Sequence, residues 1–298
     1  MIVVITNPAS GRGHGARALP GVRAAFGAVG VHDVRVTPNE GREQRAVRDA
    51  LDDGATTIAI VGGDGTWGRC AAALVESGAD AKMAFLSGGT GNDFAKNLGA
   101  PARDYEAMAR LVTGPHRELR VDLGCIAHEG GRDLFLNVAG FGFDVAVLER
   151  ILRGGRLSGP AVYVAAAARE LFAYHGFNLR RDGAAARRAM MVVISNGLNF
   201  GGAFRIAPAA RVDDGLLDFI EIGDVRGLAR LPLLARALRG AHLTHPRVTA
   251  DRAAHADLRF DAPPAYDIDG EMRRATSTDV RVSSLRGALR VVAGPPDA

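Results

Sequence analysis

The stretch Ile58-Ala59-Ile60-Val61-Gly62-Gly63-Asp64-Gly65-Thr66 decides the fold. Its four apolar residues predict a short buried strand that ends in a loop of glycines with one carboxylate and one hydroxyl. Glycine, which lacks a Cβ atom, adopts positive φ and lets the backbone approach a ligand closely. Successive N–H groups in such a turn form a concave anion site. We therefore expect a phosphate here, with Asp64 beside a metal ion or a reacting hydroxyl. A plain turn is the alternative, but it rarely needs three glycines around an aspartate.

The same arrangement occurs twice more in the first third of the chain. Ile2–Ile5 leads into Asn7-Pro8-Ala9-Ser10-Gly11, and Met83–Leu86 leads into Ser87-Gly88-Gly89-Thr90-Gly91-Asn92-Asp93-Phe94. Loops that follow the strands of an open parallel sheet lie together at the carboxyl ends of those strands, where such folds bind ligands. Three such loops predict a nucleotide or phosphate site. Asn92-Asp93 has a second interpretation, as a cap of the next helix.

Residues 1 to about 120 alternate strand and helix patterns, which predicts an α/β domain with a parallel sheet. A further strand is expected at Val34–Val36. Helices are expected at Arg17–Phe26, Glu43–Asp53, Trp67–Ser77 and around Tyr105 to Val112.

Residues 121–298 change in style and predict a second, mainly antiparallel β-rich domain. The extended runs are Val121–Leu123, Leu134–Ala139, Met190–Ile194, Asp218–Ile222, Leu258–Phe260, Tyr266–Ile268 and Val280–Val282. Two helices are expected around 159–174 and 226–239. The last strand, about 288–298, is able to return to the first domain.

The composition of the 298 residues is that of a globular protein, with a net charge of +4. This charge is compatible with an anionic partner but too small to argue for nucleic acid, and aromatic residues do not alternate with basic ones as in single-strand binders. We expect no signal peptide and no transmembrane segment, and hence a cytoplasmic protein. Cys70 and Cys125 are isolated and are expected to be reduced, buried and without a metal.

Other motifs keep two interpretations each. The chain has no P-loop signature, but Gly11 to Ala16 contains a weak dinucleotide-binding match. Asp267-Ile268-Asp269-Gly270-Glu271 is either an acidic site at a glycine turn or an ordinary hairpin. Asp213-Asp214-Gly215 is a turn or an oxygen-ligand loop for a hard cation. The leucine- and arginine-rich helix at 226–239 either lies on an anionic membrane or packs on the core with a solvated arginine face.

These loops resemble the diacylglycerol kinase catalytic-domain family, which includes bacterial lipid kinases, sphingosine kinases and ceramide kinases. The resemblance continues through Asn137–Asp144, Gly201-Gly202, Ala207–Ala209, Asp213–Asp218 and Asp269–Glu271, so that it covers nearly the whole chain. It implies a three-layer α/β domain that binds ATP and a β-rich domain that carries part of the lipid site. It also implies transfer of the γ-phosphoryl group of ATP to a lipid hydroxyl, with diacylglycerol or a related lipid as the expected acceptor.

The resemblance assigns site residues by position. Contacts with the Mg²⁺–ATP complex fall on Asn7, Pro8, Ala9, Ser10, Gly11, Thr37, Gly62, Gly63, Asp64, Gly65, Thr66, Trp67, Gly68, Thr90, Asn92 and Asp93. A structural Mg²⁺ site maps to the side chain of Asp214 and the carbonyls of Arg211 and Leu216. Glu271 or Asp269 accepts the hydroxyl proton, whereas the sphingosine kinase branch gives this role to the residue matching Asp64. The base therefore stays open among these three.

The chain departs from the family pattern directly after the central loop. The family usually reads x-Asn-Glu, and this chain reads Trp67-Gly68-Arg69. An amide and a carboxylate are lost and a cation is gained, so Arg69 either pairs with a phosphate or fills space on the following helix.

Three other functions compete with a lipid kinase. The first is a dinucleotide oxidoreductase that uses Gly11 and Gly13, which leaves the other two loops unexplained. The second is a kinase of a soluble substrate such as a nicotinamide dinucleotide, since that class also carries a Gly-Gly-Asp-Gly loop. The third is a nucleotide- or lipid-binding regulator without catalysis. As partners we expect a lipid at the membrane surface, bound peripherally, and no nucleic acid; a homodimer is left open.

Overall fold

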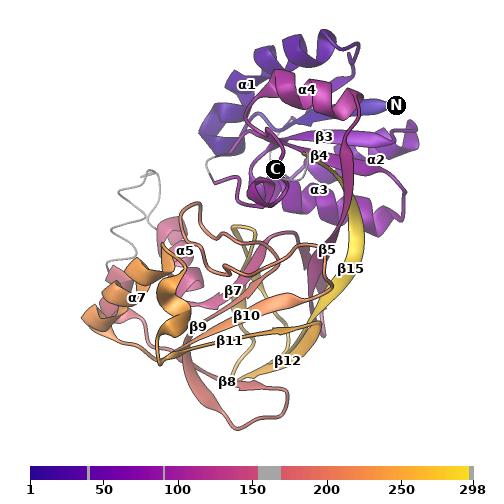
Figure 1. The fold of residues 1–298 in the computed structure, drawn as a ribbon. Coiled ribbons are helices and arrows are strands. Elements are labelled where there is room, and N and C mark those ends of the chain that lie inside the picture. Colours follow the sequence, from indigo (N-terminus) through magenta and orange to yellow (C-terminus); the bar gives the residue numbers. More distant parts are fainter. Residues whose placement is uncertain (39–40, 90, 154–168, 295–298) are drawn as a thin grey trace. The chain divides into compact units, whose positions relative to one another are not determined.

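The computed structural model describes residues 1–38, 41–89, 91–153 and 169–294 (Figure 1). The described residues form two compact units. The first contains Met1–Leu123, Arg211–Gly215 and the residues from Leu285 onward, and the second contains the rest. Because β5 (Arg117–His128) and β15 (Asp279–Ala293) each cross a unit boundary, the two units share these strands.

The first unit is built on a parallel sheet with the strand order β15-β4-β3-β1-β2. Its strands are buried runs of Val, Ile and Ala, as expected for a sheet covered on both faces. They are β1 (Ile2–Thr6), β2 (Val34–Val36), β3 (Thr57–Gly62), β4 (Lys82–Ser87) and the end of β15.

Helices cover both faces of this sheet. One core cluster joins α1 and α4 to alternate sheet residues such as Val4, Ala59 and Leu86, while α2 packs against α3. The helices are α1 (Ser10–Gly27), α2 (Glu43–Asp52), α3 (Asp64–Ser77), η1 (Phe94–Asn97) and α4 (Tyr105–Thr113). The predicted α/β fold of this part is confirmed.

The strand register brings the three glycine loops to one edge of the sheet. Thr6 at the end of β1 pairs with Val36 on one side and Val61 on the other. Gly62 pairs with Ser87. Since all these strands run parallel, the residues that follow each of them start from the same edge.

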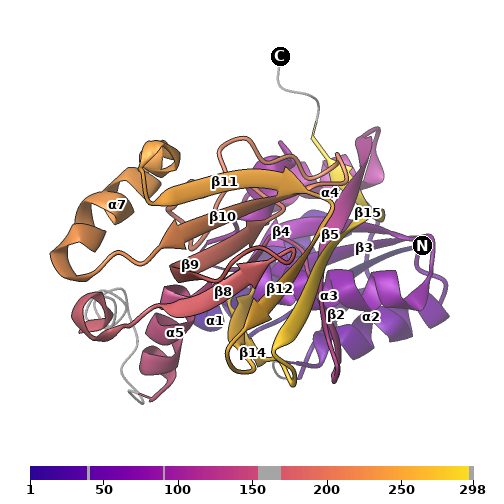
Figure 2. The same ribbon diagram turned by 90° about the horizontal axis from the view of Figure 1, so that it is seen from below.

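The second unit is mainly antiparallel, as predicted. Its strands pair in the order β14-β13-β7-β9-β8-β12-β15, with β10 between β9 and β11 (Figure 2). They are β6 (Gly131–Phe135), β7 (Val138–Gly142), β8 (Phe177–Arg181), β9 (Arg187–Ser195), β10 (Leu217–Gly223), β11 (Val248–Ala253), β12 (His255–Phe260), β13 (Ala265–Ile268) and β14 (Glu271–Arg274), with parts of β5 and β15.

Two apolar clusters stabilise the second unit. One lies among the strands and includes Phe135, Phe141, Phe219 and Tyr266. The other packs the helices on the sheet, with Leu233 of α7 among its buried members. The helices are α5 (Phe143–Arg153), η2 (Gly227–Ala229), α7 (Arg230–Ala237) and η3 (Ala241–Thr244). None of the described helices is both long and apolar enough to cross a membrane.

The structure corrects several predicted elements. The single run predicted at Leu134–Ala139 is two strands, because the amides of residues 136–138 donate to a carboxylate instead of continuing one ladder. Helices α1 and α3 begin earlier than expected, at Ser10 and Asp64. Residues 154–168 of the helix expected at 159–174 lie outside the described residues. Strands β8, β11 and β14 and helix α5 were not predicted.

Candidate functional site

The three glycine loops of the first unit are bonded directly to one another. The Ser10 hydroxyl donates to the carbonyl of Asn7 (2.8 Å) and to that of Gly88 (2.9 Å), which joins the first loop to the third. The Gly88 amide donates to the Gly62 carbonyl (2.6 Å), which joins the third loop to the second. The strand ends and their loops therefore form one cluster.

The glycines of this cluster are required by close backbone contacts. A Cβ on Gly11 would lie 2.5 Å from the Gly88 carbonyl oxygen, and its φ of +56° also disfavours a side chain. A Cβ on Gly89 would lie 2.6 Å from the Cα of Gly63. Side chains are thus excluded where the loops meet, and main-chain groups line the site.

Asn7 connects the first loop to two other elements. Its amide group donates to Glu43 Oε1 (2.5 Å) and to Thr66 Oγ1 (3.1 Å), and its own oxygen accepts the Ala9 amide (2.9 Å). Asn7, Glu43 and Thr66 are buried. Because every polar group of the Asn7 side chain is bonded, the position of the first loop is coupled to α2 and α3.

Arg69 pairs with a carboxylate of the protein itself. Its Nη2 lies 2.8 Å from Oε1 of Glu43, whose side chain is 0 % exposed. Glu43 opens α2 and Arg69 lies in the second turn of α3, so the ion pair connects the two helices. Where the family pattern has a carboxylate, this chain thus has a cation that is paired with a carboxylate of α2.

Asp64 lies in the first turn of α3, facing the start of η1. Its Oδ1 accepts the amide of Phe94 (3.1 Å). Burial raises the pKa of Asp64 to about 6; the Phe94 amide opposes this shift and the neighbouring Asp93 charge adds to it. Asp93 is itself paired with Lys96 (2.6 Å). Asp64 is thus partly desolvated and has little positive charge near it, as expected of a group that meets a cation.

The remaining residues assigned to the nucleotide are placed as follows. Thr37 is buried at the end of β2, where its amide donates to the Thr6 carbonyl (3.0 Å). Asn92 has a φ of 52° and donates to the Gly89 carbonyl (2.9 Å). Pro8, Ala9, Gly65 and Gly68 lie within the same loops and first turns, and Thr90 lies outside the described residues.

Trp67 belongs to the core rather than to the loop surface. Its indole is fully buried, donates to the Ile60 carbonyl (3.2 Å) and contacts Phe85 edge to face. Its side chain thus fixes α3 to the sheet directly behind the central loop. This buried position argues against a contact between the indole and a nucleotide.

The loop assigned to a structural Mg²⁺ surrounds a buried aspartate that the sequence reasoning did not single out. Asp122 accepts the amides of Gly215 and Gly287, both at 2.6 Å. Burial raises the pKa of Asp122, and the charges of Asp214 and Asp213 add to the shift. No three acidic, His or Cys side chains gather into a metal site among the described residues, and Asp213 pairs with Arg211 (3.4 Å), so the Mg²⁺ site assigned to this loop stays a prediction. The signal in the sequence was an acidic residue, Asp122, between the apolar residues Val121 and Leu123.

The acidic turn of the second unit is a two-residue hairpin between β13 and β14. Asp269 and Gly270 have φ values of 51° and 89°, as in a type I′ turn. The Asp269 carboxylate accepts three amides, from Leu136 (2.7 Å), Asn137 (2.9 Å) and Val138 (3.0 Å). It therefore holds the β6–β7 bend, and its lone pairs are largely engaged.

The other acids of this hairpin differ from Asp269. Glu271 is half-buried and pairs with Arg273 (2.7 Å). Burial raises the pKa of Asp267 well above its usual range, and the charges of Asp144 and Asp269 add to the shift. Burial also raises the pKa of Asp144 to about 7. Glu271 is thus the acid best suited to accept a proton, because Asp267 favours its neutral form.

A pocket of about 370 Å³ lies beside this hairpin in the second unit, and its lining combines aromatic rings with the charged residues Glu149, Arg188 and Asp261. Phe141 and Phe260 stack in its wall with their ring centroids 5.1 Å apart, and Phe177 packs against Phe260. Pro264, at the start of the hairpin, also lines it. Its aromatic wall is suited to an apolar chain.

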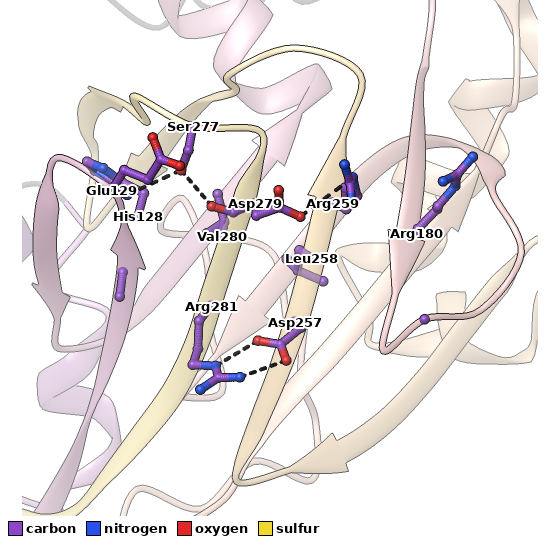
Figure 3. A pocket seen from close by; sticks show the side chains of 12 residues that line it. His128, Glu129, Arg180, Asp257, Leu258, Arg259, Ser277, Asp279, Val280 and Arg281 are labelled. Carbon is purple, nitrogen blue, oxygen red and sulfur yellow. Dashed lines mark hydrogen bonds and ion pairs between the residues drawn. The ribbon is translucent and has the colours of Figure 1, made fainter.

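A larger pocket of about 650 Å³ in the second unit is not a good catalytic candidate (Figure 3). Its charged groups face one another: Arg281 pairs with Asp257 (2.7 Å) and Arg259 with Asp279 (3.6 Å). The pKa of Asp257 is lowered, chiefly by the hydrogen bond from Arg281. No predicted site residue lines this pocket, and two of its carboxylates, those of Asp257 and Asp279, are already paired with arginines.

Comparisons with known proteins were made on the whole chain. Residues 1–126 match the diacylglycerol kinase catalytic domain, and residues 137–293 match the YegS C-terminal NAD kinase beta sandwich-like domain. A probable YegS-like lipid kinase of Chromohalobacter salexigens is 33% identical over 83% of this chain and 84% of its own length. A diacylglycerol kinase of Mycobacterium tuberculosis is 29% identical over 98% of this chain and 94% of its own.

A solved structure gives the same result for the fold. The crystal structure of a putative diacylglycerol kinase from Bacillus anthracis superposes with a TM-score of 0.74, at 23% identity, over 99% of this chain and 97% of the other. The two-domain architecture is therefore shared with a known protein.

Proposed function

The chain belongs to the diacylglycerol kinase catalytic-domain family, and from this premise we propose that it transfers the γ-phosphoryl group of ATP to a lipid hydroxyl, with diacylglycerol or a related lipid as acceptor. The observation that carries the proposal is the closed cluster of three glycine loops with the partly desolvated Asp64 beside it. We propose that the enzyme is cytoplasmic and meets its substrate at the membrane surface.

The loops bind the phosphates through main-chain groups. Phosphoryl transfer needs the phosphates aligned and their charge neutralised, with little covalent work from the protein. The amides around Gly11, Gly63 and Gly89 lie where no side chain can block a phosphate. Magnesium, when bound with ATP, would supply charge neutralisation, and Asp64 is the carboxylate that we assign to hold it near the phosphates.

Glu271 is the proposed general base. In the reaction the lipid hydroxyl oxygen forms a bond to the γ-phosphorus, the bond to the β–γ bridging oxygen breaks, and the hydroxyl proton passes to the glutamate. Asp269 is occupied by three amides and Asp267 favours its protonated form, which leaves Glu271 as the acid of the hairpin that we assign as proton acceptor. Such a base contributes about 10²–10⁴ in rate.

A soluble acceptor is the second candidate, because the domain matched by residues 137–293 is described as NAD kinase beta sandwich-like. The aromatic wall of the pocket beside the hairpin favours a lipid instead.

The deciding experiment uses radiolabelled ATP with a panel of diacylglycerol, phosphatidylglycerol, a sphingoid base, ceramide and NAD, read by thin-layer chromatography. We expect label in a lipid phosphate. Label in the dinucleotide alone would contradict the lipid assignment. ATP binding without transfer to any acceptor would identify a regulator without catalysis.

A further inference from the structure

Large apolar side chains are exposed at one place in the second unit. Among the described residues, Phe172 is 64 % exposed, Leu228 65 %, Leu231 46 % and Leu238 48 %. The other exposed large hydrophobic side chains, Met1 and Val36, belong to the first unit. Single exposed leucines are ordinary, but a group of four in one unit indicates a binding surface. We call these four residues the apolar patch.

A buried arginine holds the two parts of the apolar patch together. Arg230, at the start of α7, is 1 % exposed and donates to the carbonyls of Val225, Glu170, Leu171 and Tyr174 at 2.6–2.9 Å. It thus fixes the helical residues 169–173, which carry Phe172, against η2 and α7. A Cβ on Gly227 would lie 4.0 Å from the Phe172 ring, so this ring adjoins the start of the leucine stripe.

The exposed leucines lie along the η2–α7 segment, whose helix α7 is labelled in Figures 1 and 2. Leu228, Leu231 and Leu238 are spaced by three and seven residues, which places them on one helical face. Leu233 and Ala237 on the other side are buried in the core. The core-facing interpretation of this helix is therefore correct for one face only, since most of its leucines point away from the protein.

The surroundings of the apolar patch are strongly basic. Between Asp224 and Asp251 the chain has five arginines and no Asp or Glu. Arg226, Arg236 and Arg239 are exposed next to the patch leucines in the chain; Arg226 also pairs with Asp224 at 2.9 Å. Exposed apolar side chains with arginines beside them are typical of helices that lie in the interface of an anionic bilayer.

The charge argues against a second copy of the chain as the occupant. In a symmetric dimer formed through this face, the arginines of one copy would approach those of the other, and like charges in contact are unfavourable. Anionic lipid head groups supply the opposite charge and an apolar layer together. The helix does not need to span the bilayer for this.

We propose that the apolar patch inserts into the interface of an anionic membrane while Arg226, Arg236 and Arg239 bind lipid phosphates. This inference rests on the proposed function, since it names the surface by which a lipid kinase would reach a substrate dissolved in a bilayer.

The test measures binding of the full chain to sedimented vesicles, of phosphatidylcholine alone or mixed with phosphatidylglycerol. Leu228→Gln with Leu231→Gln is expected to weaken binding to both vesicle types, by about tenfold or more for the mixed ones. Arg236→Gln with Arg239→Gln is expected to weaken binding to anionic vesicles by about fivefold per arginine and to remove their advantage over neutral ones. Because all four positions are exposed, folding should be preserved, as checked by melting temperature.

Two matched controls come from the first unit. Val36→Gln removes an exposed apolar side chain and Arg110→Gln an exposed arginine that only pairs within α4. Both should bind vesicles like the unaltered chain. Unchanged vesicle binding in the patch variants would overturn the proposal. So would a shift from dimer to monomer in those variants with vesicle binding intact, since the patch would then join two copies.

Activity separates this inference from the proposed function. The patch variants should phosphorylate a water-soluble short-chain diacylglycerol at the unaltered rate and lose transfer to long-chain lipid in vesicles. If the unaltered chain phosphorylates no lipid yet binds anionic vesicles through the patch, the kinase proposal fails and the surface stands. If the unaltered chain phosphorylates the soluble lipid and the patch variants keep full activity on lipid in vesicles, the proposed membrane-binding surface is wrong. The kinase proposal would still stand.

Discussion

Two glycine turns, one in each unit, use their aspartates in opposite ways. Asp64 in the first unit accepts the Phe94 amide and is left with a raised pKa of about 6. Asp269 in the second unit accepts three amides and fixes the bend between β6 and β7. A carboxylate saturated by the protein stabilises the fold, whereas one held in a partly desolvated position costs stability until a cation arrives. Under the proposed function, this difference would separate the acid that acts on the nucleotide from the acid that stabilises the fold.

The largest expected effect is on the first of these acids. Asp64→Asn keeps the acceptor for the Phe94 amide but removes the charge that would meet Mg²⁺ and the phosphates. Transfer of phosphate to lipid should fall by about 10³-fold or more. The measurement is kcat/KM with purified lipid and ATP, beside a melting curve. A variant with normal turnover would show that Asp64 has no part in catalysis.

Glu271→Gln tests which acid of the hairpin is the base. Because Gln cannot accept the hydroxyl proton, kcat should fall by about 10²–10³-fold with little change in the KM for ATP. Stability should change by less than about 0.5 kcal/mol, as is usual at a half-buried position without a cap or core role.

Asp269→Asn is the matched control for that variant. Asn tolerates positive φ, and its oxygen can still accept the amides of Asn137 and Val138, but its NH₂ group would face the Leu136 amide. Unfolding in urea should show a loss of about 1–3 kcal/mol. If instead Asp269→Asn lost turnover with its stability intact while Glu271→Gln stayed active, the roles of the two acids would be reversed.

Removing Glu43 tests whether its ion pair with Arg69 compensates for the departure from the family pattern at position 69. Glu43→Ala leaves Arg69 without its buried partner and removes an acceptor from Asn7, so stability should fall by about 2–4 kcal/mol and the KM for ATP should rise several-fold. Hydrogen exchange of the peptide spanning residues 7–16 should become faster without nucleotide.

The double variant Glu43→Ala with Arg69→Met serves as control. It lacks both charges of the ion pair and should recover part of the lost stability, while the KM stays high because Asn7 still lacks its acceptor on α2. Equal KM values for ATP in the unaltered chain, the single variant and the double variant would show that the ion pair only joins the two helices.

Much of the fold could be predicted because the signals were local. The apolar runs before Asn7, Gly62 and Ser87 and the glycines after them define the parallel strands and the edge where their loops meet. The role of Asp269 could not be predicted, since the amides it accepts lie more than 130 residues earlier in the chain. Glu43 was missed for the same reason: at the start of an amphipathic helix it looks like any solvated acid, and only the packing of α2 on α3 buries it.

The smallest expected effect is a gain of stability, and it sharpens the contrast between the two aspartates. The folded pKa of Asp64 is raised above its unfolded value of about 3.9, so the folded state binds more protons between about pH 4 and pH 6. The ionised carboxylate therefore destabilises the nucleotide-free protein above that window and does not below it. Asp64→Asn should accordingly be more stable than the unaltered chain by about 1–2 kcal/mol at pH 7, and the gain should vanish near pH 4. Urea unfolding at both pH values measures this. Asp269→Asn should lose stability at pH 7. If Asp64→Asn also lost stability at pH 7, both acids would stabilise the fold.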